Sequence, residues 1–344
     1  MLKSRRFWLG VVVSATFLAL FFYRVDFVAM GQVLLEANYI FLLPALAVYF
    51  IGVWFRAVRW HYLLHPVGNF ASHRLFRLIV IGFTVNNIIP GRLGILLRAY
   101  ILGEREGVSK IAVGATVGVE RVFDGLVLVL FLVVISFFVL LPEGAEVTGL
   151  VEVVRWVALG IFLGCLLILL FITFMENTAR RVAGALLRRF PSGSRLKWDE
   201  WLDAAISGLR LPRRRGRLLA VSVTSLLVWL CEGGMFYLLS LSFNLGQPFH
   251  IMLLVMSIAT MSWFVLVSPG GVGAFDWFGR ETLVVFGVPI ATASAAILLI
   301  HATLILPVIA LGFVFLWMEN LSLADVVGRR QRLSQQHDTK EGAE

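Results

Sequence analysis

Long apolar stretches separated by short polar segments make up most of the chain. Six of them run without interruption for close to, or more than, the ~20 residues that an α-helix needs to cross a bilayer. They cover residues 7–23, 40–60, 111–141, 153–174, 218–243 and 289–317. The pattern predicts an all-α integral membrane protein with about six full transmembrane helices.

Two further apolar stretches, residues 75–102 and 251–288, are interrupted by proline and glycine. Proline removes a backbone donor, and glycine tolerates the turn conformations that follow. Irregular backbone at membrane depth persists only where protein buries it or where it lines a polar cavity. We therefore expect two broken, re-entrant hairpins. The helix-breaking residues are Pro90, Gly91 and Gly94 in the first stretch and Pro269, Gly270, Gly271 and Gly273 in the second.

Positive charge lies between the apolar stretches. The chain is 59% hydrophobic and 15% charged, with a net charge of +9 and a mean hydropathy of +0.89. Residues 176–217, which we expect to form an amphipathic basic segment, hold 11 Arg and Lys against four acidic residues, so this segment should be cytoplasmic. Hairpins at both broken stretches keep it there, with both termini cytoplasmic. We expect a multi-pass protein of the cell (inner) membrane, and no nucleic acid partner.

The two broken stretches resemble each other. The sequence Pro-Gly-x-x-Gly occurs in both, and a Gly-Val pair follows each at residues 107–108 and 287–288. Arg121 and His301 stand 14 residues after these glycines. With three full crossings between the copies, units of about 75–141 and 251–317 would form an inverted repeat, as in many transporters. We expect residues 1–320 to be a single membrane domain and residues 321–344 a disordered cytoplasmic tail.

Four short motifs in order carry a family resemblance. They are Arg56-x-x-Arg59-Trp60, Asn87-x-x-Pro90-Gly91-Arg92-x-Gly94-x-x-x-Arg98, Glu120-Arg121-x-x-Asp124 and Pro269-Gly270-Gly271-x-Gly273-x-x-Asp276. With them the chain resembles the membrane region of lysylphosphatidylglycerol synthases, also called the flippase-like UPF0104 family, over nearly its whole length. The resemblance implies movement of lipids between leaflets. The chain ends 27 residues after Trp317, so we expect no synthase domain, and Ile95 stands where the family usually has an acidic residue.

Charged residues within the 111–141 stretch are the first candidates for function. Glu120 and Asp124 are four apart and share a helix face, and Arg121 reaches Asp124 at three. An ionisable residue at membrane depth costs at least ~2.5–3.5 kcal/mol, so such a group is retained when it is paired or faces a polar cavity. The group is either an ion-pair knot that pins this helix to the first hairpin, or a site for a lipid phosphate, or both.

The residues around the breaks supply further candidates. Arginine suits bidentate phosphate contacts, although Arg98 is also explained by snorkelling to the headgroups. Asp276 and Arg280 are four apart and are expected to pair, and His301 serves packing or a proton relay. The lipid- or phosphate-binding candidates are Arg92, Arg98, Arg121, Arg280 and Asn87, and the acidic or relay candidates are Glu120, Asp124, Asp276, Glu281 and His301. We expect no catalytic residue, cofactor or metal site.

These features favour a lipid translocase that is not driven by ATP, because the second break lacks the Gly-Lys-Ser/Thr ending of a nucleotide-binding loop. Its substrate would be an anionic or headgroup-modified phospholipid or a polyprenyl lipid, held in a polar groove between the two hairpins. The alternative is a membrane subunit or enzyme of lipid-linked sugar or aminoacyl-lipid metabolism. A non-transporting partner of a separately encoded lipid-modifying enzyme stays open as well.

Overall fold

The computed structural model describes residues 5–23, 25–89, 93–138, 215–265 and 269–319, with a few isolated helical residues between 156 and 167. This part of the chain forms ten α-helices and two short 3₁₀ helices, η1 (Tyr39–Phe41) and η4 (Pro269–Gly271), and it contains no strand. The expected all-α class is confirmed.

Four helices are long and apolar enough to cross a membrane. They are α3 (Leu42–Leu64) with the η1 turn before it, α6 (Lys110–Phe138), α10 (Arg215–Ser242) and α13 (Ile290–Met318). They confirm four of the six expected crossings. The expected segment 7–23 forms α1 (Arg5–Phe22), which would be a fifth crossing only together with α2 (Phe27–Glu36), to which it is bent by 83°. The expected crossing at 153–174 lies outside the described ranges.

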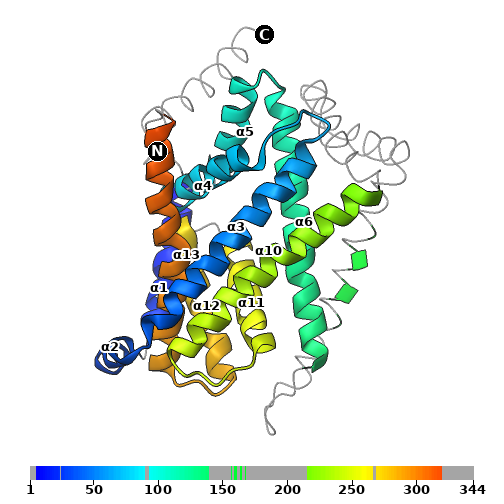
Figure 1. Ribbon diagram of the computed structural model, residues 1–344. Coiled ribbons are helices and arrows are strands. Elements are labelled where there is room, and N and C mark those ends of the chain that lie inside the picture. Colours follow the sequence, from blue (N-terminus) through cyan, green and yellow to red (C-terminus); the bar gives the residue numbers. More distant parts are fainter. Residues whose placement is uncertain are drawn as a thin grey trace.

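Each interrupted stretch forms two helices that pack against each other. The first pair is α4 (Ser72–Ile88) and α5 (Leu93–Arg105), and the second is α11 (Phe249–Val265) and α12 (Ala274–Val285), with η4 at its turn. In the first pair a Cβ on Gly94 would lie 1.8 Å from the carbonyl oxygen of Gly82, so the two backbones touch. Figure 1 shows α4 and α5 in the upper half of the bundle and α11 and α12 in the lower half.

The two helix pairs are tied to opposite ends of the bundle. At one end, Glu319 after α13 accepts hydrogen bonds from Arg77 of α4 and Arg105 of α5. At the other end, the Gln247 amide before α11 donates to the carbonyl of Phe286 after α12 (3.1 Å). Helix α13 connects these two ends. Between these ends, the η4 turn of the second pair contacts α4 of the first pair.

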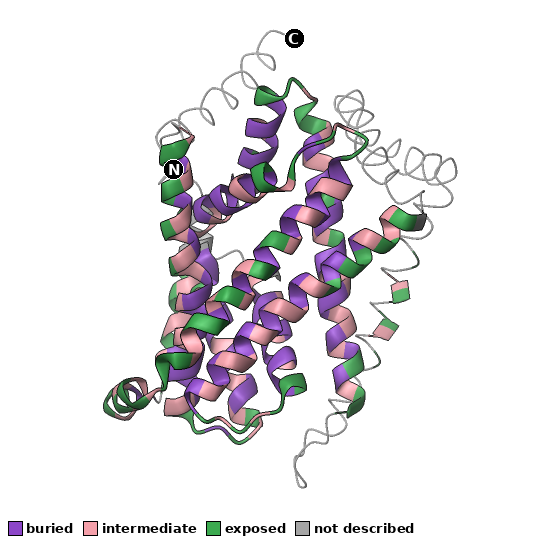
Figure 2. Ribbon diagram, in the orientation of Figure 1, coloured by how far each residue is buried: buried purple, intermediate pink, exposed green. Residues whose placement is uncertain are grey.

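Apolar side chains cover the outer surface of the long helices as well as the core. Leu43, Ile40 and Trp317 are 76%, 72% and 80% exposed, and exposed residues run along the outward faces of α3, α6 and α13 in Figure 2. Such a surface suits contact with lipid chains rather than with water. The chain is therefore a multi-pass membrane protein.

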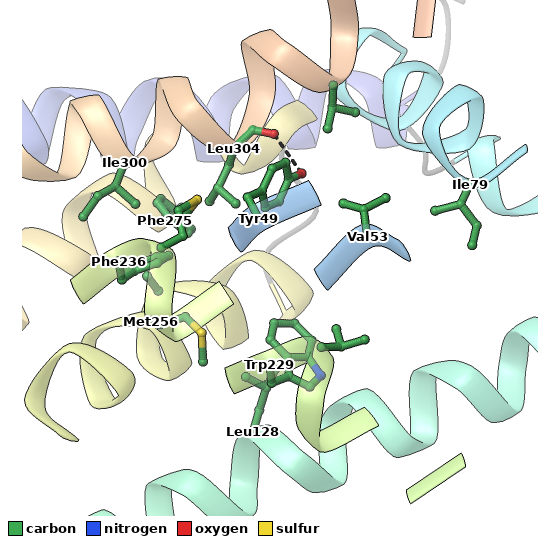
Figure 3. Close-up of a cluster of buried hydrophobic side chains, with 14 of the residues drawn as sticks. Tyr49, Val53, Ile79, Leu128, Trp229, Phe236, Met256, Phe275, Ile300 and Leu304 are labelled. Atoms are coloured by element: carbon green, nitrogen blue, oxygen red, sulfur yellow. Dashed lines mark hydrogen bonds between the residues drawn. The ribbon is translucent and has the colours of Figure 1, made fainter. Parts of the chain in front are cut away.

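Two side-chain hydrogen bonds hold α13 near a proline that lies within it. Pro307 lies inside this helix and cannot donate a backbone hydrogen bond. The Tyr49 hydroxyl of α3 donates to the Leu304 carbonyl (3.1 Å), and the Thr84 hydroxyl of α4 donates to the Val308 carbonyl (3.0 Å). Figure 3 shows Tyr49 and Leu304 within the apolar core. The bridges fix α13 against α3 and against α4 of the first helix pair.

Candidate functional site

Seven ionisable residues on four helices form a buried group that we call the arginine cluster. Their placement follows from helical spacing, since residues three or four apart share a face. All of these side chains but that of Arg121, which is 29% exposed, are buried or nearly buried where the four helices meet. The members are Arg56 and Arg59 of α3, Arg98 of α5, Glu120, Arg121 and Asp124 of α6, and Glu232 of α10.

Arg59 is the centre of this cluster and is fully buried. Its Nη2 donates to Glu120 Oε1 (2.8 Å), and its Nη1 donates to Asp124 Oδ1 (2.7 Å) and to the Ser225 hydroxyl (3.1 Å). The planar guanidinium thus spans two carboxylates that lie one helical turn apart. This fork bonds α3 to α6 and α10 together.

The carboxylates of the cluster are shared among several donors. Arg56 donates to Glu232 (2.7 Å) and lies 3.8 Å from Asp124. Asp124 also accepts from the Trp229 indole (3.1 Å) and pairs with Arg121 (3.4 Å). The expected pairing of Arg121 with Asp124 is confirmed. Asp124 is therefore surrounded by donors and needs no further partner.

Arg98 is bonded less completely than Arg59. It is 2% exposed, its Nη2 donates to Glu120 Oε2 (2.6 Å), and its guanidinium lies 4.8 Å from the ring of Trp60. Its Nε and Nη1 atoms are buried and have no hydrogen-bond partner among the described residues. A buried donor without an acceptor costs about 1–3 kcal/mol. Arg98 therefore offers the N–H groups of two nitrogen atoms, Nε and Nη1, to an acceptor from outside the cluster.

The ion-pair interpretation, in which α6 is pinned to the first broken stretch, is borne out by a bond between α6 and α5. Glu120 bonds both Arg98 of α5 and Arg59 of α3, so one carboxylate joins three helices. With every group ionised, the four arginines of the cluster exceed its three carboxylates by one positive charge. The arrangement can therefore hold an anion at the Arg98 side.

A second buried group, the histidine cluster, lies at the break of the second helix pair. His301 of α13 has Nδ1 2.6 Å from Asp276 Oδ1 and Nε2 2.9 Å from the Gly270 carbonyl oxygen. Asp276 Oδ2 accepts the Gly273 backbone N–H (2.9 Å) and so caps α12. The Phe275 ring covers the imidazole at 4.5 Å. These bonds join α12, α13 and the η4 turn.

Arg280 has different partners from those expected. The expected Asp276–Arg280 pair is wrong, because Asp276 bonds His301 instead. Arg280 pairs with Glu281 and donates to the backbone carbonyls of Leu20 and Phe21. Carbonyls at a helix end lack an intrahelical partner, and α1 ends at Phe22, so the guanidinium caps that helix. Arg280 and Glu281 therefore serve the contact between α12 and α1.

The described bonds of the site candidates fall into the arginine cluster, the histidine cluster and the Arg280–Glu281 pair, and the expected shared groove stays a prediction. The described bonds of Arg98, Arg121, Glu120 and Asp124 lie in the arginine cluster, and those of Asp276 and His301 lie in the histidine cluster. Asn86, rather than the candidate Asn87, accepts the Gly94 backbone N–H (2.7 Å), and Asn87 is half-buried at the end of α4. The candidates Arg92, Pro90 and Gly91 lie outside the described residues.

Three members of the arginine cluster were not among the candidates predicted from sequence. Arg56 and Arg59 were noted only for the family resemblance, and Glu232 was not noted at all. Each is a charged residue within, or at the end of, a long apolar stretch. Since such residues are costly in a membrane, that position alone was a usable signal.

The chain is similar to a known family of membrane proteins. The chain matches the family described as "Lysylphosphatidylglycerol synthase TM region" over residues 7–312. It is 25% identical over 312 residues to a UPF0104 membrane protein of Pyrococcus horikoshii, covering 85% of this chain and 91% of that protein. A UPF0104 membrane protein of Methanothermobacter thermautotrophicus is 23% identical over 70% of this chain and 74% of its own length.

A third relative carries an enzyme name. Glycosyltransferase AglD of Haloferax volcanii is 25% identical over 291 residues, which cover 78% of this chain. The match covers 47% of that protein, so this chain spans about half its length.

Proposed function

The chain belongs to the lysylphosphatidylglycerol synthase TM region family, and on this premise we propose that it moves an anionic or headgroup-modified lipid between leaflets. The lipid is a phospholipid or a polyprenyl lipid, and the chain acts as a transporter rather than an enzyme. The arginine cluster receives the headgroup, while the apolar outer faces of the helices accompany the acyl or prenyl chains.

The incomplete hydrogen bonding of the buried Arg98 side chain is the observation that supports this proposal most. Arg98 is buried among spanning helices, keeps one fixed bond to Glu120, and has two nitrogen atoms, Nε and Nη1, without an acceptor among the described residues. Phosphate oxygens suit such a fork, because charge-assisted hydrogen bonds to guanidinium are among the stronger ones. An anionic headgroup would also cancel the single excess positive charge of the cluster. A phosphate is therefore the ligand that best completes the site.

The positions of the helix pairs support an alternating mechanism. We infer that α4–α5 and α11–α12 are re-entrant hairpins in an inverted repeat, each followed by a long helix, α6 or α13. Gly107 and Gly287, at corresponding places before those helices, both have positive φ (67° and 82°). The basic segment 176–217 supports a cytoplasmic location for both termini in the cell (inner) membrane. Movement of one hairpin against the other would expose the cluster to each leaflet in turn.

Reconstitution into liposomes tests the proposal directly. Fluorescent phospholipids in both leaflets are quenched from outside, and the rate at which inner lipids become accessible is measured. We expect the wild-type chain to accelerate this exchange. Arg98→Gln should slow it by about tenfold or more, as for the loss of ~1.5 kcal/mol of charged hydrogen bonding.

Arg74→Gln is the matched control, since the Arg74 side chain is 66% exposed and pairs with Glu106 on the surface. It should exchange lipid at the wild-type rate. Exchange no faster than in protein-free liposomes, for phospholipids and polyprenyl phosphates alike, would overturn the proposed function.

A role in lipid-linked sugar metabolism is the second candidate, because of the match to Glycosyltransferase AglD. The chain would then serve as the membrane part of such a system, alone or beside a separately encoded lipid-modifying enzyme. Release of sugar from a polyprenyl-linked donor by the purified chain would favour this function over transport.

A further inference from the structure

The geometry of the histidine cluster fixes how many protons it holds. The Gly270 carbonyl can only accept a hydrogen bond, so His301 Nε2, 2.9 Å away, must carry a hydrogen. Nδ1 and Asp276 Oδ1 are 2.6 Å apart, and a hydrogen bond at that distance requires a proton on one of them. A neutral imidazole beside an ionised carboxylate has one proton too few for both bonds.

The geometry points to a proton-binding site formed by Asp276 and His301, separate from the arginine cluster. The bound proton makes the pair either an imidazolium with a carboxylate or an imidazole with a carboxylic acid. Both forms are electrically neutral, as suits a pair that is 2% and 5% exposed.

The proton holds the turn of the second helix pair in place. Nε2–H of His301 bonds the Gly270 carbonyl, and Asp276 bonds the Gly273 N–H. Gly270, Gly271 and Gly273 have φ of 61°, 77° and 91°, values that favour glycine and let the turn rearrange. A Cβ on Gly270 would lie 3.6 Å from the carbonyl of Asn87, so this turn rests on the end of α4.

Loss of the proton would break this arrangement. One of the two short contacts of His301 would then bring two lone pairs together, and the buried pair would carry a net negative charge. Either Asp276 or the Gly270 carbonyl would have to move away. The contact between the η4 turn and α4, where the two helix pairs meet, would be released with it.

Other charged groups near the histidine cluster already have partners. On α12, Arg280 and Glu281 pair with each other, and Arg280 also caps α1. On α3, the Tyr49 hydroxyl donates to the Leu304 carbonyl, three residues beyond His301. On α10, Glu232 is held by Arg56.

Among the other described segments that pack on α12 and α13, Glu36 of α2 is exposed and Tyr237 of α10 packs on Phe249. Residues 7–22 of α1, the η4 turn and the rest of α13 contain no titratable group. The titratable residues of α4 (His73, Arg74 and Arg77) lie in its first turns, at the end of the helix away from the break. His250 lies at the start of α11, which is likewise the end away from the break. A pH response of this turn would therefore come from Asp276 and His301.

The role of this proton site rests on the proposed function, because the proton would then be the ion that is coupled to lipid movement. The presence of the bound proton can be tested without measuring lipid transport. The full chain, labelled with ¹⁵N-histidine and embedded in nanodiscs, is studied by NMR over the pH range in which histidine titrates. His301→Gln identifies the His301 signals, and the infrared carboxylic acid band lost in Asp276→Asn identifies a protonated Asp276.

We expect His301 with both nitrogens protonated, or with Nε2–H beside a protonated Asp276, changing to a singly protonated imidazole beside a carboxylate as the pH rises. A singly protonated His301 next to an ionised Asp276 at every pH would overturn the inference. The spectra that decide the number of protons are recorded on the wild-type chain, and the two variants serve only to assign its signals.

Liposomes with an imposed proton gradient separate this inference from the proposed function. We expect the gradient to change the rate of wild-type lipid exchange, and Asp276→Asn and His301→Gln to lose that response. Exchange that ignores the gradient in the wild-type chain would overturn the coupling while leaving transport intact. Absence of all exchange would instead count against the proposed function, and the spectra would still decide the proton site.

Discussion

At the scale of single residues, each buried carboxylate of the arginine cluster is paired with at least one arginine. Arg59 is bonded to Glu120 and Asp124, and Arg56 is bonded to Glu232. Ion pairs of this kind offset the cost of removing charges from water only while both partners are present. The stability of the helix bundle therefore depends on Arg59 more than on any surface arginine.

Substitution of Arg59 should be strongly destabilising. Arg59→Gln removes two ion pairs at once and leaves two buried carboxylates short of donors, which we expect to cost about 3 kcal/mol or more. Thermal unfolding of the purified chain in detergent measures the change. Arg98→Gln is the comparison, because Glu120 keeps its bond to Arg59 there, and its loss should be clearly smaller. Equal losses for the two variants would contradict a central role for Arg59.

The local pair of this cluster and a link between α6 and the first helix pair could be predicted from sequence, but the bonds of Arg59 could not. Arg121 and Asp124 are three residues apart in one helix, and their pairing was expected. Arg59 meets partners 61 and 65 residues away, and that meeting depends on how α3 packs against α6. The expected Asp276–Arg280 pair failed for a similar reason, since His301 and the end of α1 offered better partners from other helices.

At the scale of helices, the first pair depends on a very close approach of two glycines. A Cβ on Gly94 would lie 1.8 Å from the Gly82 carbonyl oxygen and 2.8 Å from Asn86 Oδ1. Backbone atoms cannot make room as the end of a flexible side chain can. The Pro-Gly-x-x-Gly sequence indicated a break here, but sequence alone could not show that α4 packs directly on the residue after that break.

We therefore predict that Gly94→Ala separates α4 from α5. The expected result is a loss of about 1–3 kcal/mol, as for overpacking elsewhere in a core, together with reduced lipid exchange. Gly31→Ala in α2 is the control, because no described residue lies within 4 Å of its Cβ position and alanine favours a helix. Thermal unfolding of both variants measures the effect. Wild-type stability of Gly94→Ala would contradict the close approach.

At the end of this pair away from the break, α4 and α5 are both bonded to the Glu319 carboxylate, which lies outside the membrane-spanning segments. Hydrogen bonds from Arg105 and then Arg77 lower the pKa of Glu319, against a smaller opposing effect of burial. A carboxyl whose pKa is lowered on folding stabilises the fold above its unfolded pKa. That stabilisation is lost as the pH falls through the lower, folded value.

Glu319→Gln should therefore lower the melting temperature at neutral pH but not in acid. The difference should correspond to at most about 1 kcal/mol, because the arginines are partly exposed to solvent. It should shrink as the pH falls below the ordinary range of glutamate. Glu106→Gln, which loses only the exposed pair with Arg74, is the control. A difference that stays constant down to acid pH would show that charge plays no part.

At the scale of the whole molecule, the two helix pairs enter the bundle from opposite ends. The long crossings were predictable because bilayer thickness sets a minimum length for an apolar helix. The direction of the pairs came from charge, since only hairpins keep the basic segment 176–217 on the side of the first residues. The separate helix α2 was not predicted, because ten residues are too few to stand out as a crossing.

Opposite entry predicts which turns are reached from which side of the membrane. Glu106 lies in the exposed turn after α5, and His250 lies in the exposed start of α11. In a chain with Cys165 and Cys231 replaced by serine, Glu106→Cys should react with an impermeant maleimide only after the cells are opened. His250→Cys should react in intact cells. Labelling of both positions from one side would contradict the prediction that the two helix pairs enter the membrane from opposite sides. Lipid movement by alternating exposure of the arginine cluster would then lose its structural basis.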